Sequence, residues 1–266
     1  MDSKQKKDYL WLNLRDLPYF RALLRAVEAS FYQDLPLVEP VLDLGCGDGN
    51  FASIAFDQKI ETGMDPWRKQ LGLAAQTGAY KLVLLADGGK MPFPDDVFNT
   101  VISNSVLEHI PDVDTVIIET ARVLKPGASF IFCVPNQNFT HNLSISRFLE
   151  RLGWKKLAAG YRKWFNKISR HHHCDSQQVW GERLARNHLI IDQVWDYFSP
   201  DALGVLEWGH YFGVPSLVAK SLTGRWILAP TRWNLGWLEK LLRPYYLEPK
   251  EQPRGSYSFY VTHKSA

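Results

Sequence analysis

The stretch that decides the fold is Val41-Leu42-Asp43-Leu44-Gly45-Cys46-Gly47-Asp48-Gly49-Asn50-Phe51. Its apolar, β-branched start predicts a short buried strand. Three glycines at alternate positions then predict a tight turn, in which backbone amides approach a ligand that side chains would exclude. We expect a helix to follow, because Asp48 or Asn50 can cap it and Phe51 and Ile54 begin an apolar face. A strand, a glycine turn and a helix form the first unit of a nucleotide-binding α/β domain.

The turn does not match a dinucleotide site. The dinucleotide fingerprint has glycine at the sixth position of G-x-G-x-x-G, whereas Asn50 stands there in this chain. The pattern is instead Asp-x-Gly-x-Gly-x-Gly, formed by Asp43, Gly45, Gly47 and Gly49. It resembles the first motif of class I S-adenosylmethionine-dependent methyltransferases. A glycine-rich turn that binds no ligand is the alternative interpretation.

Two carboxylates follow the next two predicted strands. A strand-like stretch at 59–62 leads into Gly63-Met64-Asp65-Pro66-Trp67, and another at 80–86 leads into Asp87-Gly88. By the logic of dinucleotide sites, the Asp65 carboxylate can accept hydrogen bonds from both ribose hydroxyls of an adenosine. The resemblance implies that Asp87 lies beside the adenine amino group. Trp67 is expected either as an apolar wall against the adenine or as a helix-packing residue.

The next segments continue in the order of this family. Residues 91–99 lead into a strand at 100–103, and the turn at 122–128 leads into a strand at 129–134. Across residues 38–136 the chain resembles the small-molecule branch of the class I methyltransferases. It departs from the family pattern at Asn99, where Asp is usual, at Ala128, where a second Gly is common, and at Trp67 after the ribose carboxylate.

The resemblance implies S-adenosyl-L-methionine as the cofactor. The residues expected to hold it are Asp43, Gly45, Cys46, Gly47, Gly49, Asp65, Pro66, Trp67, Asp87, Gly88 and Asn104. The expected fold is α/β, a doubly wound, Rossmann-like, mostly parallel seven-stranded sheet with a helical insertion after the fifth strand. The sheet order and an antiparallel last strand come from the resemblance alone.

The chain is expected to divide into three parts. Residues 1–138 would hold the N-terminal helices and the cofactor-binding part of the methyltransferase domain. Residues 139–198 would form a basic, aromatic helical insertion that acts as a lid. Residues 199–266 would supply the C-terminal helices and last strands of the same domain.

Composition favours a cytoplasmic enzyme. The chain has 266 residues, 45% of them apolar, and a net charge of +3, which is too mild to demand a nucleic-acid partner. No run of about eighteen apolar residues predicts a membrane-spanning helix. The polar start, Met1 to Lys7, lacks the apolar core of a signal peptide. Three scattered cysteines do not form a disulfide framework, which fits a reducing compartment.

Residues 147–173 concentrate positive charge. They hold eight lysines and arginines against one glutamate, and aromatic and aliphatic residues recur among them at helical spacing. Gly153 is expected to separate two short basic amphipathic helices. Three roles stay open for this segment: a lid over the acceptor, a contact with a membrane surface or polyanion, or a helical pair with a merely solvated basic face.

Histidines supply the candidate catalytic groups. His109 follows the fourth predicted strand, near where the resemblance places the transferred methyl, and it is the expected general base, with Glu108 behind it. The alternative is that both residues only orient the loop. The run His171-His172-His173-Cys174-Asp175 looks like a metal cluster, but consecutive residues cannot easily aim at one ion. We expect a polar loop there and no metal site.

The expected function is in-line methyl transfer to a small-molecule or lipid-like acceptor. Eight of the ten tryptophans lie beyond residue 150, which suits an aromatic acceptor side or simply builds the core of the second half. Nucleic acid is disfavoured as the methyl acceptor, because Asn104-Ser105-Val106-Leu107 lacks the Pro-Pro-aromatic motif of the enzymes that methylate base amino groups. The alternatives are an RNA methyltransferase and a non-catalytic cofactor-binding protein. The sequence does not indicate the acceptor or the oligomeric state.

Overall fold

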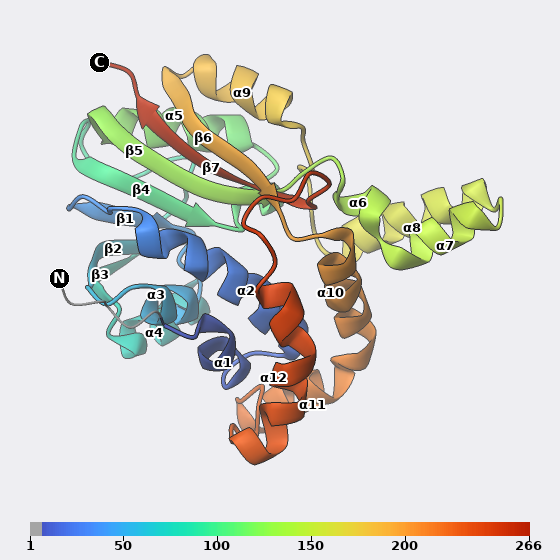
Figure 1. Cartoon of the computed structure of the whole chain (residues 1–266). Helices are drawn as coiled ribbons and strands as arrows, with labels where there is room; N and C mark the ends of the chain where they lie inside the picture. Colours follow the sequence, from blue (N-terminus) through green and yellow to red (C-terminus); the bar gives the residue numbers. More distant parts are fainter. Residues whose placement is uncertain (1–6) are drawn as a thin grey trace.

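A sheet of seven strands in the order β3-β2-β1-β4-β5-β7-β6 forms the centre of the computed structural model (Figure 1). The structure describes residues 7–266, with Val214 described by its backbone alone. Strands β3, β2, β1, β4 and β5 run parallel, and β7 is antiparallel to both β5 and β6. The predicted doubly wound, mostly parallel sheet is therefore confirmed. The strands are β1 (Val41–Leu44), β2 (Ile60–Asp65), β3 (Tyr80–Leu85), β4 (Phe98–Asn104), β5 (Leu124–Pro135), β6 (Leu189–Tyr197) and β7 (Tyr257–Lys264).

Helices cover both faces of the sheet and bury a separate apolar core on each. Neighbouring residues of β4 show this directly, since Val101 packs in one core and Ile102 in the other, and both are fully buried. A strand buried on both faces is typical of parallel α/β sheets. One face carries α1 (Tyr9–Leu14), α2 (Tyr19–Phe31), α3 (Asn50–Ala55) and α4 (Arg68–Thr77), and the other carries α5 (Val113–Val123) and α9 (Gln177–Ala185) (Figure 1).

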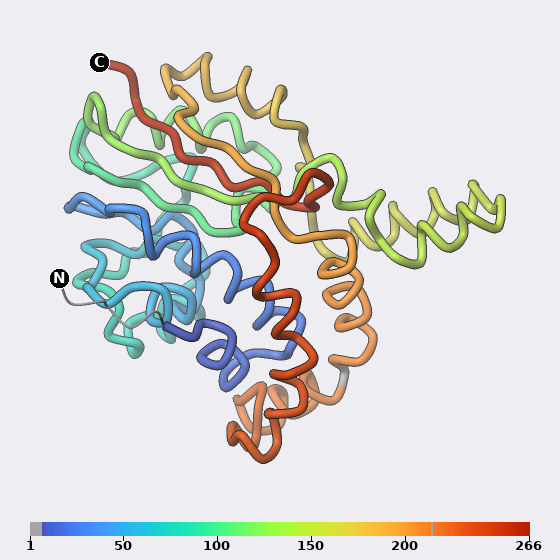
Figure 2. Tube along the Cα trace, viewed as in Figure 1, coloured from blue at the N-terminus to red at the C-terminus, as the bar shows by residue number. Residues whose placement is uncertain are grey.

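The connection after β5 begins as the predicted helical insertion. It contains α6 (Phe139–Asn142), α7 (Ser144–Arg151) and α8 (Lys155–Ile168). Gly153 joins α7 to α8 with a φ of +79°, so the predicted break between two basic helices is confirmed. The α7–α8 hairpin projects from the body of the molecule (Figure 2). Residues 139–198 also contain α9 and strand β6, which pairs with β7 in the sheet.

The C-terminal part between β6 and β7 is helical. It contains α10 (Pro200–Phe212), α11 (Val214–Thr223) and α12 (Arg232–Tyr246). Ser199 caps α10 by accepting a hydrogen bond from the Ala202 N–H, with Pro200 in the first turn. Pro244 lies inside α12 and does not end the helix, because a proline in the last turn removes a single intrahelical hydrogen bond.

The N-terminal segment before β1 forms two separate α-helices. α1 ends at Leu14 and α2 starts at Tyr19, with Pro18 as its N-cap residue. Proline forces the residue before it out of the helical region, so one continuous helix is excluded. The three cysteines are free thiols, in agreement with the sequence.

No helix in residues 7–266 is long and apolar enough to cross a membrane. The expectation for the start of the chain, Met1 to Lys7, falls outside the described residues except at Lys7.

Two helical glycines give opposite expectations for stability. A Cβ at Gly209 in α10 would overlap the Phe20 side chain of α2, whereas a Cβ at Gly236 in α12 meets no described atom within 4 Å. Alanine gains about 0.5–1 kcal/mol of helix propensity over glycine, and overpacking costs about 1–3 kcal/mol. Gly209→Ala should therefore lower the free energy of unfolding and Gly236→Ala should raise it. Denaturant titration of both variants checks this, and a Gly209→Ala protein as stable as Gly236→Ala would contradict the α2–α10 packing.

Candidate active site

The glycine turn after β1 adopts the backbone that its sequence requires. Gly45, Gly47 and Gly49 have φ values of +79°, +55° and +74°, which side chains with a Cβ rarely adopt. The N–H groups of Gly45 and Cys46 donate to the Met64 carbonyl at 2.8 and 3.0 Å, which fixes the turn against β2. A Cβ at Gly47 would meet no described atom within 4 Å, so the outer side of the turn is open to a ligand.

Helix α3 starts directly from this turn. Its N-cap residue is Gly49, which has no side chain to cap it, and the Asp48 carboxylate accepts a hydrogen bond from the Asn50 N–H at 3.2 Å. The predicted helix is confirmed, and Asp48 assists its first turn from one position earlier than a standard cap.

Asp65 ends β2 and faces the glycine turn. Its two carboxylate oxygens accept hydrogen bonds from the backbone N–H groups of Gly47, at 2.9 Å, and Trp67, at 2.8 Å. Burial raises its pKa above the ordinary value. Each oxygen keeps a free lone pair, so the carboxylate can still accept from ligand hydroxyls. Trp67 is 70% exposed, so its ring is not a helix-packing residue and is free to lie against a ligand.

Asp43 and Cys46 lie beneath the turn. The Asp43 carboxylate accepts a hydrogen bond from the Tyr80 hydroxyl at 2.6 Å, and burial raises its pKa to about 6. The Cys46 thiol is also buried, and burial raises its pKa. Both side chains support the turn from the core side. Their direct contact with a cofactor stays a prediction.

The residues predicted after β3 lie beside the same turn. Asp87 is exposed, and its carboxylate accepts a hydrogen bond from the Gly89 N–H at 2.8 Å. The Ala86 N–H donates to the Asp65 carbonyl, which ties the end of β3 to the end of β2. A Cβ at Gly88 would lie 3.2 Å from the Leu44 side chain, so the chain passes close to β1. The structure thus brings the predicted residues of β1, β2 and β3 to one edge of the sheet.

Asn104 is turned into the core. Its side-chain amide donates to the Glu28 carboxylate at 2.6 Å, and its backbone carbonyl accepts from the Arg25 guanidinium at 3.2 Å. Ser105 and Tyr197 also donate to Glu28, at 2.8 and 2.9 Å. A role for Asn104 in cofactor binding stays a prediction, and the side-chain amide is already engaged.

Sequence reasoning missed the buried ion pair that Arg25 and Glu28 of α2 form. Its signal is Glu28, which lies at helical spacing from Leu24 and Phe31, so a carboxylate stands on an otherwise apolar helix face. Arg25, three residues earlier, neutralises it at 2.9 Å.

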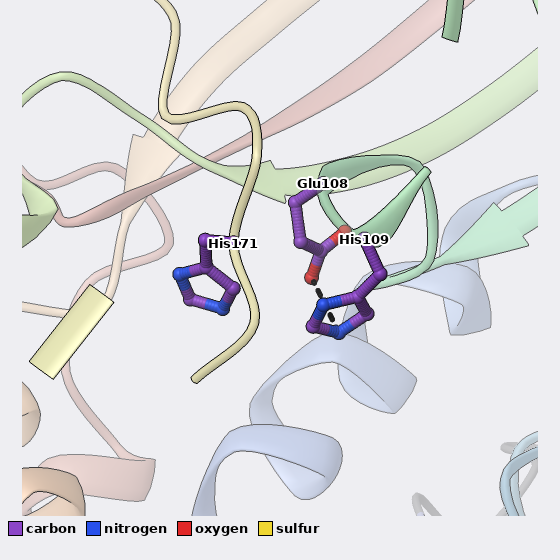
Figure 3. Close-up of side chains that lie close together, drawn as sticks. All are labelled: Glu108, His109 and His171. Atoms are coloured by element: carbon purple, nitrogen blue, oxygen red, sulfur yellow. Dashed lines mark ion pairs between the residues drawn. The ribbon is translucent and has the colours of Figure 1, made fainter. Parts of the chain in front are cut away.

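Glu108, His109 and His171 converge from two segments (Figure 3). Glu108 and His109 belong to η2 (Leu107–His109), directly after β4, whereas His171 follows α8. Their side-chain nitrogen and oxygen atoms lie within 4.8 Å of one another. The N–H groups of His172 and His173 donate to the Glu108 carbonyl at 2.7 and 3.3 Å, which holds the two segments together.

The protonation of this cluster follows from its burial. Burial raises the pKa of Glu108 to about 8, so this carboxyl is mostly protonated at neutral pH, and its Oε2 has no hydrogen-bond partner in residues 7–266. Burial lowers the pKa of His171 to about 3 and the pKa of His109 below its ordinary 6.5. Nδ1 of His109 lies 3.0 Å from the Arg170 carbonyl, which can only accept, so the proton is on Nδ1 and Nε2 keeps a free lone pair.

The group is also the one arrangement found in residues 7–266 that could hold a metal ion. The sequence analysis considered His171-His172-His173-Cys174-Asp175 alone and so missed the approach of His171 to η2. Nε2 of His173 instead donates to the Ile110 carbonyl at 3.0 Å, which agrees with a polar loop.

Two cavities meet at His109. One, of about 780 Å³, lies between Trp67 and α8 and is lined by Lys163, Asn166, Lys167 and Arg170 to His172. The other, of about 420 Å³, is enclosed by α2, η2, α6, the end of α8, α10 and β7. It is lined by Phe20, Arg21, Leu24, Arg25, Ser105, Glu108, His109, Phe139, Ile168, Ser169, Arg170, His171, Leu206, His210 and Tyr257. His109 therefore lines both cavities.

Comparison with known proteins accounts for this arrangement. Residues 42–132 match the family described as a methyltransferase domain. The chain carries a class I S-adenosylmethionine-dependent methyltransferase domain. A demethylmenaquinone methyltransferase of Bacillus licheniformis is 35% identical over 105 residues, which are 37% of this chain and 45% of that protein. A ubiquinone biosynthesis O-methyltransferase of Vibrio atlanticus is 31% identical over 111 residues, which are 37% of this chain and 44% of that protein.

The similarity in sequence covers the cofactor half of the methyltransferase. The chain matches less than half the length of these two curated relatives. Solved structures extend the likeness in fold. The geranyl diphosphate C-methyltransferase of Streptomyces coelicolor has a TM-score of 0.55 at 16% identity, with 99% of this chain and 84% of that chain covered. The [4+2]-cyclase SpnF has the same TM-score at 17% identity, with 94% and 83% covered, so this fold alone does not establish methyl transfer.

The residues at the open turn fit S-adenosylmethionine. Backbone amides at positive φ, an adjacent carboxylate and an exposed indole suit its amino acid, ribose and adenine parts. Asp65→Ala should weaken cofactor binding by about 1.5–3 kcal/mol, because hydrogen bonds to a charged group are lost. Calorimetry with S-adenosylhomocysteine measures the change. Asp96→Ala, at the opposite end of β4, is the control, and equal affinity in both variants would remove Asp65 from the ribose role.

Proposed function

We propose that the protein transfers a methyl group from S-adenosylmethionine to a small-molecule or lipid-like acceptor that occupies the cavity of about 420 Å³. The observation that carries this proposal is His109, which lines both cavities and whose Nε2 is not the nitrogen held by the Arg170 carbonyl. Apolar walls from Phe20, Leu24 and Ile168 suit a largely apolar acceptor.

The residues act by positioning and by removing a proton. The sulfonium of the cofactor supplies an electrophilic methyl, so the protein has to align the acceptor and exclude water. Asp65, the glycine turn and Trp67 would hold the cofactor with its methyl toward η2. His109 would accept the acceptor proton at Nε2, while the Arg170 carbonyl holds Nδ1–H. Glu108 is mostly protonated at neutral pH, so it supplies no negative charge to stabilise the imidazolium that forms on His109.

The relatives support this class of acceptor. Their names refer to menaquinone and ubiquinone precursors, and a sterol 4-C-methyltransferase of Caenorhabditis elegans is 36% identical over 118 residues, which are 41% of this chain and 35% of that protein. The lack of a Pro-Pro-aromatic motif after Asn104 disfavours base methylation. Assaying S-adenosylhomocysteine release with quinone precursors, sterols and RNA separates these acceptors, and release with RNA alone would overturn the proposal. A protein that binds the cofactor but turns over none of them would favour the non-catalytic alternative.

His109→Ala should slow methyl transfer by about 10²–10⁴-fold, the usual contribution of a general base. Cofactor affinity should stay close to that of the wild type. His263→Ala is the control, because this histidine lies on β7 opposite Ser129, at the far end of β5 from the site. The wild-type rate should fall as pH drops through the pKa of His109, below 6.5, because only the neutral ring accepts a proton. A variant that keeps this pH dependence would exclude His109 as the titrating group.

We also propose that the basic segment 147–173 closes over the acceptor. Lys163 and Lys167 of α8 line the cavity that Trp67 and His109 share. Arg162 has another task, since it donates to Glu150 at 2.6 Å and ties α8 to α7. A second proposal for the same hairpin is peripheral membrane contact, supported by its exposed Phe148, Trp154 and Leu157 among the lysines and arginines.

The double variant Lys163→Gln/Lys167→Gln tests the lid. Turnover should fall about three- to thirtyfold, the range expected from two exposed charge contacts, while cofactor affinity stays unchanged. Lys155→Gln/Lys156→Gln, at the far end of the hairpin, removes the same charge and should leave turnover as it is. If neither double variant changes turnover or sedimentation with vesicles, the basic face is only solvated.

A further inference from the structure

Residues 208–238 contain no acidic residue. This stretch of thirty-one residues runs from the end of α10 through α11 into α12 and holds four tryptophans, at 208, 226, 233 and 237. Its charged residues are Lys220, Arg225 and Arg232, all basic. Tryptophan, leucine and basic residues without acids are the composition of helices that lie in a membrane interface.

The apolar side chains of this region are exposed rather than packed. Trp233 is 92% exposed, Leu222 80% and Phe212 67%. The further exposed large apolar residues of α10 to α12 and the turn after it are Trp208, Leu217, Val218, Leu228, Trp237, Leu241 and Leu247. Monomeric proteins rarely expose so many large apolar side chains from one part of the chain unless that surface binds a partner. We name these ten residues the apolar end face.

The acidic residue that follows the acid-free stretch is largely buried. Glu239 follows the acid-free stretch, is 9% exposed, and forms ion pairs with Arg232 and Arg243. Asp8 pairs with the same Arg243 at 2.8 Å. These two negative charges are thus paired, and Lys220, Arg225 and Lys240 add positive charge to the surface.

A groove continues the apolar end face toward the basic hairpin. It has a volume of about 810 Å³ and is lined by Trp208 and Phe212 of α10, Trp237 and Leu241 of α12, and Phe148 of α7. Arg147 and Arg151 of α7 also line it, as does Asp201 of α10, whose carboxylate lies 4.0 Å from the Arg147 guanidinium. Exposed aromatic and aliphatic side chains from three helices therefore share one hollow with basic side chains beside it.

We propose that the apolar end face is a docking surface for an anionic lipid bilayer. Trp233, Trp237 and Leu222 enter the interfacial layer, and Lys220, Arg225 and Lys240 contact acidic headgroups. Charge decides between a bilayer and a second copy of the chain, because two basic surfaces repel each other while an acidic headgroup layer complements them. This inference rests on the proposed lipid-like acceptor and adds to it a surface formed by α10 to α12, which adjoins segment 147–173 at the groove.

Vesicle sedimentation tests the proposal with the full chain. The wild type should sediment with vesicles of phosphatidylglycerol and phosphatidylcholine and much less with phosphatidylcholine alone. Leu222→Glu/Trp233→Glu should weaken sedimentation at least about tenfold, because both positions lose apolar contact and gain negative charge. Ile118→Glu is the matched control, since Ile118 is 53% exposed on α5, on the other face of the sheet.

Further readings separate the outcomes. Both variants should keep wild-type affinity for S-adenosylhomocysteine and a wild-type circular dichroism spectrum, which shows that they fold. Equal sedimentation of the double variant and the wild type would overturn the proposal. A wild-type dimer in light scattering that the double variant converts to a monomer would also overturn it in favour of a second copy. Loss of vesicle binding would not contradict the proposed methyl transfer, because turnover of a detergent-solubilised acceptor is measured separately.

Discussion

The buried carboxylate of Glu28 is the interaction on which the arrangement of the site depends. It receives hydrogen bonds from Arg25, Asn104, Ser105 and Tyr197, so it joins α2, the end of β4 and β6. Removing one partner of such a buried ionic group leaves an uncompensated charge and is strongly destabilising. Ser105 has a φ of +52°, a strained conformation for a residue with a side chain, and its bond to Glu28 helps to hold it. The turn that starts there carries Glu108 and His109 into the cavity.

Burial then sets the protonation states that the chemistry needs. The same low-dielectric surroundings keep His109 and His171 neutral and Glu108 protonated, so the cluster holds little net charge despite its three titratable groups. A neutral imidazole with one nitrogen held by a carbonyl is suited to accept a proton from a hydroxyl or amine. The cluster forms only because η2 and the loop after α8 meet, so its chemistry depends on that contact.

The sequence predicted the cofactor half well because its signals are local. Gly45, Gly47 and Gly49 require positive φ, and Asp65 follows a strand, so each residue's place can be deduced from its neighbours. The acceptor half depends on contacts across the chain that leave no local pattern. His171 reaches His109 across sixty-two positions, and Arg25 reaches Asn104 across seventy-nine. Pro18 and Pro244 show the same limit, because the helix position of a proline decides whether it breaks a helix, and that position is set by packing.

Helix α10 connects the acceptor cavity with the outer surface. Leu206 and His210 on one side line the cavity beside His109, whereas Val205, Trp208 and Phe212 on the other side line the apolar groove. Gly209 lies between them and allows α10 to approach Phe20 of α2 closely. One helix is therefore a wall of both spaces, and any ligand that fills the groove presses on the helix that shapes the cavity. A lipid-like acceptor that approaches from a bilayer would meet this helix first, since α10 to α12 supply the exposed apolar side chains.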